Sequence, residues 1–290
     1  MVKLKLPATE ILVLALTMVF STNLVYADSI ADRVASSKVV RIGTGNKTPP
    51  MNYIDKDGKW TGFDVELGDE LAKRLGAKVE RVNVNNKTRI AFLANNRIDM
   101  TISNLSHTRS RDDVIDYAEP SYLWVAKIFY AKKGRFSNIS DLGGKVVGVT
   151  QGSNAFLAAP EEILLHSKNK PKMKAFQNNA ECFLALKQGK IDAYSQDSPI
   201  IAGVAGSEGV DYEAVGPGYS PGLYGIGVPP NDSKWRDKIS FVLQDMIKDG
   251  SYDKLYARWF GPEGKFPLPQ NAKPRLPEDS YGKMAFAWPD

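Results

Sequence analysis

The chain has 290 residues with 38 Lys or Arg, 33 Asp or Glu, and a formal net charge of +5 at pH 7. This weak basicity is spread along the sequence, without the block of Lys and Arg typical of a nucleic-acid-binding arm. A single cysteine, Cys182, excludes an internal disulfide, and the two histidines show no metal-ligand spacing. We therefore expect no metal, no cofactor and no nucleic-acid partner, and the charge gives only slight support for an anionic ligand.

Residues 1–27 are typical of a secretory signal peptide. Two lysines precede an apolar run, Ile11 to Phe20, that is too short to span a bilayer, which argues against a membrane anchor. Val25-Tyr26-Ala27 supplies small residues for cleavage after Ala27. The next residue is Asp28 rather than a lipid-bearing cysteine, so we expect an exported protein that is not a lipoprotein. Such a protein fits the periplasm, with secretion to the medium as the alternative.

Strands and helices alternate along the first half of the chain. A helix is predicted at 64–75, because its apolar residues recur at helical spacing and Gly76 follows them. The other predicted elements are a strand at 39–43, a hairpin at 53–60 around Asp57-Gly58, a strand at 79–84, a short helix at 88–94 and a strand at 98–103. This alternation favours an α/β fold with a parallel sheet.

The second half repeats the same order of elements. It contains predicted strands at 145–149, 173–176 and 191–195, and predicted helices from 155, at 180–187, at 235–249 and at 252–260. The repetition predicts two α/β lobes joined by crossings near 126–132 and 219–229, with the last helices returning to the first lobe. Residues after Pro262 are expected to form an irregular strap or to be partly mobile.

The stretch from Ile102 to Tyr122 contains the best candidate for a binding group. Small polar residues end a predicted strand, and Arg111 follows them. The planar guanidinium of arginine matches the two oxygens of a carboxylate, and the Ser106 hydroxyl can add a hydrogen bond. A solvated arginine beside a turn is the alternative interpretation.

Four stretches in a fixed order then resemble the family 3 extracellular solute-binding proteins, over nearly all of residues 38–262. They are Lys59 to Val65, Ile98-Asp99-Met100, the block from Arg111 to Tyr122, and 250–261 with GSYDK and WFG. The resemblance implies a two-lobed flytrap fold, with lobe one at 28–131 plus 222–290 and lobe two at 132–221. It also implies a monomeric periplasmic receptor that closes on a polar amino acid or related carboxylate and delivers it to an ABC permease.

The resemblance also implies a site divided between the two lobes. In the family pattern Arg111 matches the arginine for the ligand α-carboxylate, and Asp197 matches the carboxylate for the α-ammonium. Further matches are a hydroxyl donor, a residue whose backbone faces the ligand, and a glycine–serine pair at a helix N-terminus, here Ser106, Asn104, Gly152 and Ser153. Taken alone, Ser153 could be an ordinary N-cap and Asp197 a turn residue.

Selectivity for the ligand side chain is less defined. Receptors for cationic amino acids carry aromatic and acidic residues where this chain has Asn86, Thr48 and Gly45, so we do not expect a Lys, Arg or His receptor. Arg89 resembles the arginine that holds the distal carboxylate in acidic-amino-acid receptors, although it could equally be a solvated helix residue. A second arginine and a histidine of those receptors are replaced by Gly45 and Asn179.

Two other functions share the implied fold. Cyclohexadienyl dehydratases are exported enzymes that need a general acid, and the glutamate expected about three residues after Asp197 is Ile200 here. His107 is the one titratable group beside Ser106, and we expect it to point away from the cleft. We therefore predict no catalytic residue. A sensor that docks onto a receptor instead of a permease is the third possibility.

Overall fold

The computed structural model describes residues 29–268 and 272–274. The predicted signal peptide, its cleavage site and the last part of the predicted strap lie outside these residues. Within them, no helix is both long enough and apolar enough to cross a membrane.

One mixed sheet forms the centre of the molecule, with the strand order β5-β1-β6-β12-β7-β10-β8-β9 and β11 paired to β7. Its strands are β1 (Val39–Thr44), β5 (Lys78–Asn83), β6 (Met100–Thr101), β7 (Asp116–Lys132), β8 (Val146–Thr150), β9 (Lys172–Phe176), β10 (Ala193–Asp197), β11 (Tyr212–Ala214) and β12 (Tyr219–Val228). Each end of the sheet is parallel, as predicted: β1 pairs with β5 and β6, and β8 pairs with β9 and β10.

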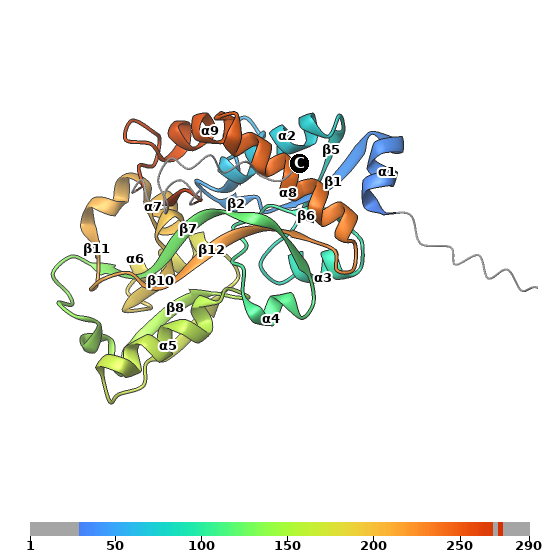
Figure 1. The fold of residues 1–290 in the computed structure, drawn as a ribbon. Coiled ribbons are helices and arrows are strands. Elements are labelled where there is room, and N and C mark those ends of the chain that lie inside the picture. Colours follow the sequence, from blue (N-terminus) through green and yellow to red (C-terminus); the bar gives the residue numbers. More distant parts are fainter. Residues whose placement is uncertain (1–28, 269–271, 275–290) are drawn as a thin grey trace, which may run out of the picture.

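The two long strands β7 and β12 make the sheet mixed. They pair with each other in antiparallel register, and β7 is also antiparallel to β10. Figure 1 shows them running side by side through the middle of the molecule, between the two groups of shorter strands. Both predicted crossings fall within these strands. The exact lobe boundaries at 131/132 and 221/222 stay a prediction.

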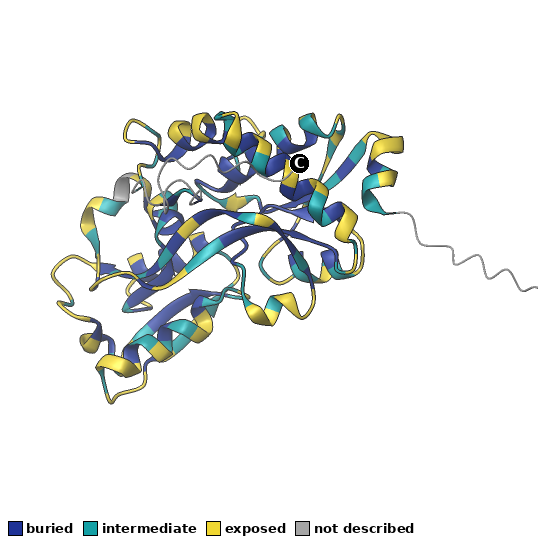
Figure 2. Cartoon of the chain, in the orientation of Figure 1, coloured by how far each residue is buried: buried dark blue, intermediate teal, exposed yellow. Residues whose placement is uncertain are grey.

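The first group of strands, β5, β1 and β6, packs with four helices, and we call this part the first lobe. The helices are α1 (Ile30–Ser37), α2 (Phe63–Arg74), α8 (Ser233–Lys248) and α9 (Ser251–Phe260). Leu67 and Leu71 of α2 share one buried cluster with Trp235 of α8 and Trp259 of α9. The C-terminal helices therefore pack with the first group of strands, and the outer faces of these helices are exposed (Figure 2).

Shorter elements complete the first lobe. These are α3 (Arg89–Ala94), α4 (Arg109–Asp112) and a small sheet of β2 (Lys47–Thr48), β3 (Asn52–Ile54) and β4 (Trp60–Thr61). Residues 262–268 follow α9 without regular structure. The N–H of Leu268 donates to the carbonyl of Phe260, and Phe266 stacks on Trp259, so the described part of the strap is irregular and packed.

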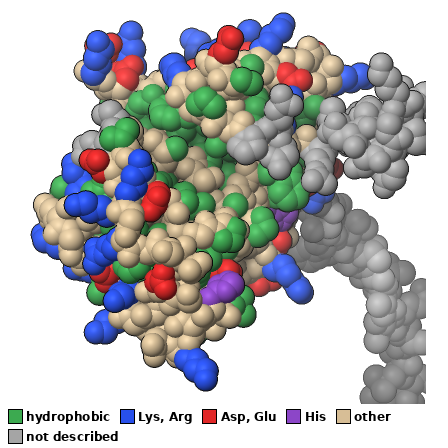
Figure 3. Space-filling model, turned by 90° about the vertical axis from the view of Figure 1, so that its left-hand side faces the viewer, with side chains coloured by type: hydrophobic (Ala, Val, Ile, Leu, Met, Phe, Trp, Pro, Cys, Tyr) green, Lys and Arg blue, Asp and Glu red, His purple; other side chains and the backbone are tan. Residues whose placement is uncertain are grey.

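The second group of strands, β10, β8 and β9, carries its own helices, and we call this part the second lobe. It contains α5 (Ala155–His166), α6 (Asn179–Lys187), α7 (Ser198–Ala205) and the short 3-10 helices at Ile139–Leu142 and Gly206–Asp211. Two buried clusters, one around Phe129 and Val147 and one around Cys182 and Tyr194, form its core. Figure 3 looks onto this end of the molecule and shows basic and acidic side chains intermingled over it.

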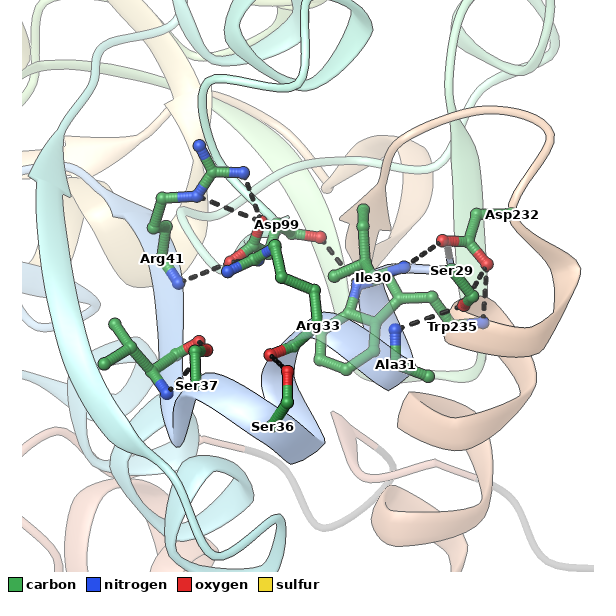
Figure 4. Close-up of polar contacts among 11 residues, drawn as sticks. Ser29, Ile30, Ala31, Arg33, Ser36, Ser37, Arg41, Asp99, Asp232 and Trp235 are labelled. Atoms are coloured by element: carbon green, nitrogen blue, oxygen red, sulfur yellow. Dashed lines mark hydrogen bonds and ion pairs between the residues drawn. The ribbon is translucent and has the colours of Figure 1, made fainter. Parts of the chain in front are cut away.

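The Ile98-Asp99-Met100 motif has a structural role in the first lobe. The Asp99 carboxylate accepts the Arg41 N–H at 2.7 Å and the Arg41 guanidinium at 2.7 and 3.1 Å. Arg33 of α1 lies 2.5 Å from Oδ2, the oxygen that also accepts the Arg41 N–H, and the Trp235 indole donates to the Asp99 carbonyl at 2.7 Å. Figure 4 shows α1, β1 and α8 converging on this residue. The motif thus joins the first helix of the described chain, α1, to α8.

Candidate functional site

The loop that follows β6, residues 103–106, is fixed from inside the first lobe by two buried charges. Asp64 accepts hydrogen bonds from the Asn104 N–H at 2.7 Å, the Asn52 amide at 2.7 Å and the Tyr122 hydroxyl at 2.9 Å. Arg89 donates from Nη1 to the carbonyls of Ser103 and Asn104. These contacts end the predicted strand at 98–103 early, since they draw the backbone of the loop out of the sheet.

Two predicted site residues, Asn104 and Arg89, therefore make hydrogen bonds inside the first lobe. The N–H of Asn104 is occupied by Asp64, and the residue has a left-handed φ of 41°. Arg89 is 2% exposed, so it is not a solvated helix residue. Its Nε has no hydrogen-bond partner among the described residues.

Burial dominates the electrostatics of this pair. It raises the pKa of Asp64 to about 6, against the hydrogen bonds and the charge of Arg89, which lower it. Burial also lowers the pKa of Arg89 to about 9, and the positive charge of Arg111 lowers it further. Both groups are charged at neutral pH. The loop thus lies between one buried carboxylate and two neighbouring guanidinium groups.

Arg111 lies on α4, next to the same loop. Its Nη1 donates to the Ser106 carbonyl at 2.6 Å, and the Tyr117 hydroxyl donates to the same oxygen at 3.1 Å. Burial raises the pKa of Tyr117 to about 12, so its hydroxyl stays protonated. In the described parts of the chain no carboxylate lies within 4.0 Å of Arg111. Its charge is therefore available to an anion.

Asp197 ends β10 in the second lobe and is 3% exposed. The Tyr224 hydroxyl donates to its Oδ2 at 2.5 Å, and Lys127 Nζ lies 3.4 Å from its Oδ1. Tyr224 also forms an isolated β-bridge with Ser106, so it joins the loop at residues 103–106 to Asp197. Sequence analysis missed Lys127, because it lies within an apolar strand and meets Asp197 only through the antiparallel register of β7 and β10.

A cavity of about 250 Å³ opens between the two lobes. Ser103 and Asn104 of the loop after β6 line it, whereas Arg111, Ser106, Ser153, Asp197 and Lys127 are not among its lining residues. Most side chains that line it carry amides or hydroxyls, and among the described residues the lining contains Lys47 but no acidic residue. The lining residues are Gly45, Asn46, Lys47, Thr48, Asn83, Val84, Asn85, Asn86, Ser103, Asn104, Thr150, Gln177, Asn178 and Asn179. The predicted selectivity positions Gly45, Thr48, Asn86 and Asn179 all belong to it.

The lobes touch each other at the edge of the cavity. Asn179 of α6 donates to the Thr48 hydroxyl at 3.2 Å. A Cβ on Gly152 would lie 2.9 Å from the backbone of Asn86, and a Cβ on Gly203 would lie 2.1 Å from the Pro49 carbonyl oxygen. Gly152 also has a φ of 72°, which favours glycine. The structure is therefore in a closed arrangement, in which two glycines of the second lobe allow close contact.

Ser153 lies next to this contact at the start of α5. The N-cap of the helix is Asn154, so the interpretation of Ser153 as an ordinary N-cap is wrong. Its N–H donates to the Thr150 carbonyl at 3.1 Å. Its hydroxyl oxygen is buried without a hydrogen-bond partner among the described residues. The hydroxyl of Ser153 is thus available, while its N–H is used in the turn.

His107 has contacts of its own beside Tyr117. It stacks on the Tyr117 ring at 4.0 Å, and its Nε2 lies 2.8 Å from the Asp112 carboxylate.

Across residues 29–268 and 272–274, no group of three or more His, Cys, Asp or Glu side chains could hold a metal ion.

The sequence matches one protein family over most of its length. The family described as bacterial extracellular solute-binding proteins, family 3, matches residues 40–262. The glutamine-binding protein of a Bacillus subtilis ABC transporter is 31% identical over 224 residues, which cover 74% of this chain and 76% of the relative. The histidine-binding periplasmic protein of Escherichia coli is 29% identical over 86% of this chain and 96% of its own length.

Solved structures show the same fold. An ancestral arginine-binding protein bound to arginine is 34% identical, with a TM-score of 0.70 over 77% of this chain and 99% of its own. An ancestral amino acid-binding protein, a precursor of cyclohexadienyl dehydratase, is 29% identical, with a TM-score of 0.71 over 80% of this chain and 99% of its own. The mixed α/β architecture with two lobes is therefore the flytrap fold that was predicted.

Proposed function

Because the chain belongs to the bacterial extracellular solute-binding proteins of family 3, we propose that it binds a small polar carboxylate, an amino acid or a related acid, between its lobes. It then delivers this ligand, as a monomer, to an ABC permease. Export to the periplasm, with cleavage after Ala27 and no lipid anchor, is part of the same proposal.

The unpaired guanidinium of Arg111 carries this proposal. Arg111 and the Ser106 backbone are held together at 2.6 Å, and the loop beneath them is fixed by Asp64 and Arg89. Such a preorganised donor binds a carboxylate without the cost of ordering the side chain first. Ser153 can contribute its hydroxyl from the second lobe.

The residues that line the cavity limit which ligand side chains can bind. Asn46, Asn86, Asn104 and Asn179 offer both donors and acceptors, and Lys47 adds a positive charge. Without an acidic residue in the described lining, a cationic side chain would lose its water and gain no partner. We therefore expect an uncharged polar or an anionic side chain, in contrast to the arginine- and histidine-binding relatives.

Binding is favoured over dehydratase catalysis. One structural neighbour is a precursor of such an enzyme, so the fold is compatible with that chemistry. However, Ile200 stands where the general acid is expected, and it is fully buried in the same apolar cluster as Met51. An aliphatic side chain there cannot transfer a proton. The curated relatives with the same family pattern are named as binding proteins.

Calorimetric titration of the purified protein with amino acids and small organic acids tests the proposal. Arg111→Ala should abolish measurable binding, because loss of one partner of a buried ion pair costs on the order of 3–5 kcal/mol. Arg109→Ala, an exposed arginine of the same helix, is the matched control and should bind as the wild type does. Retained micromolar binding by Arg111→Ala would overturn the site.

A further inference from the structure

Lys127 lies where three strands meet. In the sheet register it is directly opposite Asp197 of β10 on one side and Tyr219 of β12 on the other. The residue is completely buried. Its ammonium lies 3.4 Å from the Asp197 carboxylate and donates to the Ser220 carbonyl at 3.4 Å. The strand register therefore places this cation against the one carboxylate that was expected to receive the ammonium of a ligand.

This contact gives Asp197 a buried positive charge without any ligand, although its Oδ1 makes no hydrogen bond to the described residues. One of its oxygens accepts from the Tyr224 hydroxyl, and the other faces Lys127. A ligand ammonium at Asp197 would place a second buried positive charge close to Lys127, which is unfavourable in a low-dielectric interior.

The charges around the loop point the same way. Among the described residues the buried charged side chains are Asp64, Arg89, Asp99, Lys127 and Asp197, and Asp99 has its own arginines on the other side of the lobe. At the site itself, Asp197 is balanced by Lys127, and Asp64 by the nearby Arg89. Arg111, which is partly buried, has no carboxylate partner among the described residues, and neither has the exposed Lys47 of the cavity lining. A zwitterion would leave that surplus charge in place, whereas an anion would cancel it.

We infer that Lys127 takes the place of the ligand ammonium, and that the protein binds 2-hydroxy or 2-oxo carboxylates in preference to the corresponding amino acids. In this arrangement the ligand carboxylate lies on Arg111, and the oxygen at its second carbon accepts from Lys127. Both present contacts of Lys127 are long, so a proton of its ammonium can be redirected to such an oxygen. This inference rests on the proposed function, because it assumes that Arg111 holds the carboxylate.

Matched pairs of ligands test the inference on the full exported chain, refolded from denaturant to remove any ligand carried through purification. Aspartate is compared with malate, and glutamate with 2-hydroxyglutarate and 2-oxoglutarate, by thermal shift and then by calorimetry. These pairs keep the carbon chain and exchange only the ammonium for an oxygen. We expect the oxygen-bearing member to bind about tenfold more tightly or better, as one modest charge interaction gives. Equal or tighter binding of the amino acid would overturn the inference.

Variants then show whether Lys127 is responsible. Lys127→Met should reverse the preference by about tenfold or more, because Asp197 becomes free to receive an ammonium. The double variant Lys127→Met/Asp197→Asn removes both charges together, so it keeps the test valid if the single variant does not fold, and it should show no preference. Lys132→Met, an exposed lysine of the same strand, is the control. A pair that only stabilises the fold would change stability and leave the ratio between ligands unaltered.

Arg111→Ala separates the two proposals. If the wild type prefers amino acids and Arg111→Ala abolishes their binding, the proposed function stands and the role of Lys127 is wrong. If Arg111→Ala binds all of these ligands as the wild type does, the proposed function itself fails.

Discussion

Two buried aspartates, one in each lobe, differ in how completely the protein satisfies them. Asp99 receives three hydrogen bonds from Arg41 and an ion pair from Arg33. Asp197 receives one short hydrogen bond from Tyr224, and Lys127 lies at 3.4 Å from an oxygen that has no hydrogen-bond partner among the described residues. The contacts of Asp99 hold elements of the first lobe together. Asp197 has one oxygen that can still accept a hydrogen bond, and it lies at the junction of the two lobes.

The two aspartates also differ in the elements that surround them. Asp99 joins α1, β1 and α8, which belong to one lobe and share one apolar cluster (Figure 4). Asp197 lies at the end of β10, next to the long strands that connect the lobes. Substitutions near Asp99 should therefore change stability without changing affinity, and substitutions at the contact between the lobes should do the reverse.

Asp99→Asn should give the largest loss of stability. It removes the charge that holds two arginines, and loss of one partner of a buried ion pair costs about 3–4 kcal/mol, near the lower end of the usual range because water can still reach both guanidinium groups. Urea unfolding measures this change. Ligand affinity, measured on the folded variant, should stay at the wild-type value, and a large loss of affinity would mean that the two regions are coupled.

Asp64 should make stability fall as the pH rises from about 4 to 6. Its folded pKa of about 6 is above the unfolded value of 3.8, so in this window the folded protein holds a proton that the unfolded chain has released. The difference corresponds to about 2–3 kcal/mol, since one pKa unit is about 1.4 kcal/mol. Urea unfolding of the wild type and of Asp64→Asn at several pH values measures it.

The slope that Asp64 contributes should be missing in Asp64→Asn. Asp69→Asn is the control and should keep the wild-type slope. Asp69 lies on the same helix as Asp64, is half-exposed, and forms an ion pair with Arg81 of β5. Parallel pH profiles for the wild type and Asp64→Asn would contradict the raised pKa.

Gly203→Ala should weaken ligand binding and leave the fold intact. The new Cβ would lie 2.1 Å from the Pro49 carbonyl of the other lobe, so the closed arrangement has to open slightly. Alanine is also a better helix former than glycine, which protects the stability of α7. We expect a loss of about 2 kcal/mol in binding free energy, roughly 30-fold in Kd. Calorimetry measures the affinity, and Ala202→Ser, at an exposed position of the same helix, is the control.

Much of this architecture could be predicted from the sequence, because its signals are local. The spacing of Leu67 and Leu71 predicts α2, and Gly76 lies just beyond it. The helix over Ile30–Ser37 was not predicted, and neither were α4 and α7. The strand predicted at 98–103 shrank to Met100–Thr101, since the buried Asp64 and Arg89 bind the following backbone, and no local pattern shows such a contact.

The site divides in the same way. Arg111 and Asp197 were predicted from the family pattern and their local setting, and their roles stay a prediction. Lys127 was missed because its contact with Asp197 depends on the register of β7 and β10. Asp197 is 70 residues further along the chain, so no local pattern shows this pairing. Thr150, Tyr194 and Gln196 were missed for a similar reason, since all three donate to the Asn179 side-chain oxygen, Thr150 from β8 and the other two from β10.

Substitution of Asp232 should give the smallest loss of stability, and it tests the region of α1 and α8 around Asp99. The Asp232 carboxylate caps α8 by accepting the Trp235 N–H at 3.0 Å, and it accepts the Ser29 hydroxyl and the Ile30 N–H, both at 2.7 Å. Asp232→Ala should cost about 1–2 kcal/mol, as for the loss of an N-cap. Asp232→Ser keeps a cap but loses the reach to α1, so it should cost about half as much in urea unfolding. Equal losses in the two variants would assign the whole effect to the contact with α1, and unchanged affinity in both would keep this end of the lobe separate from the cleft.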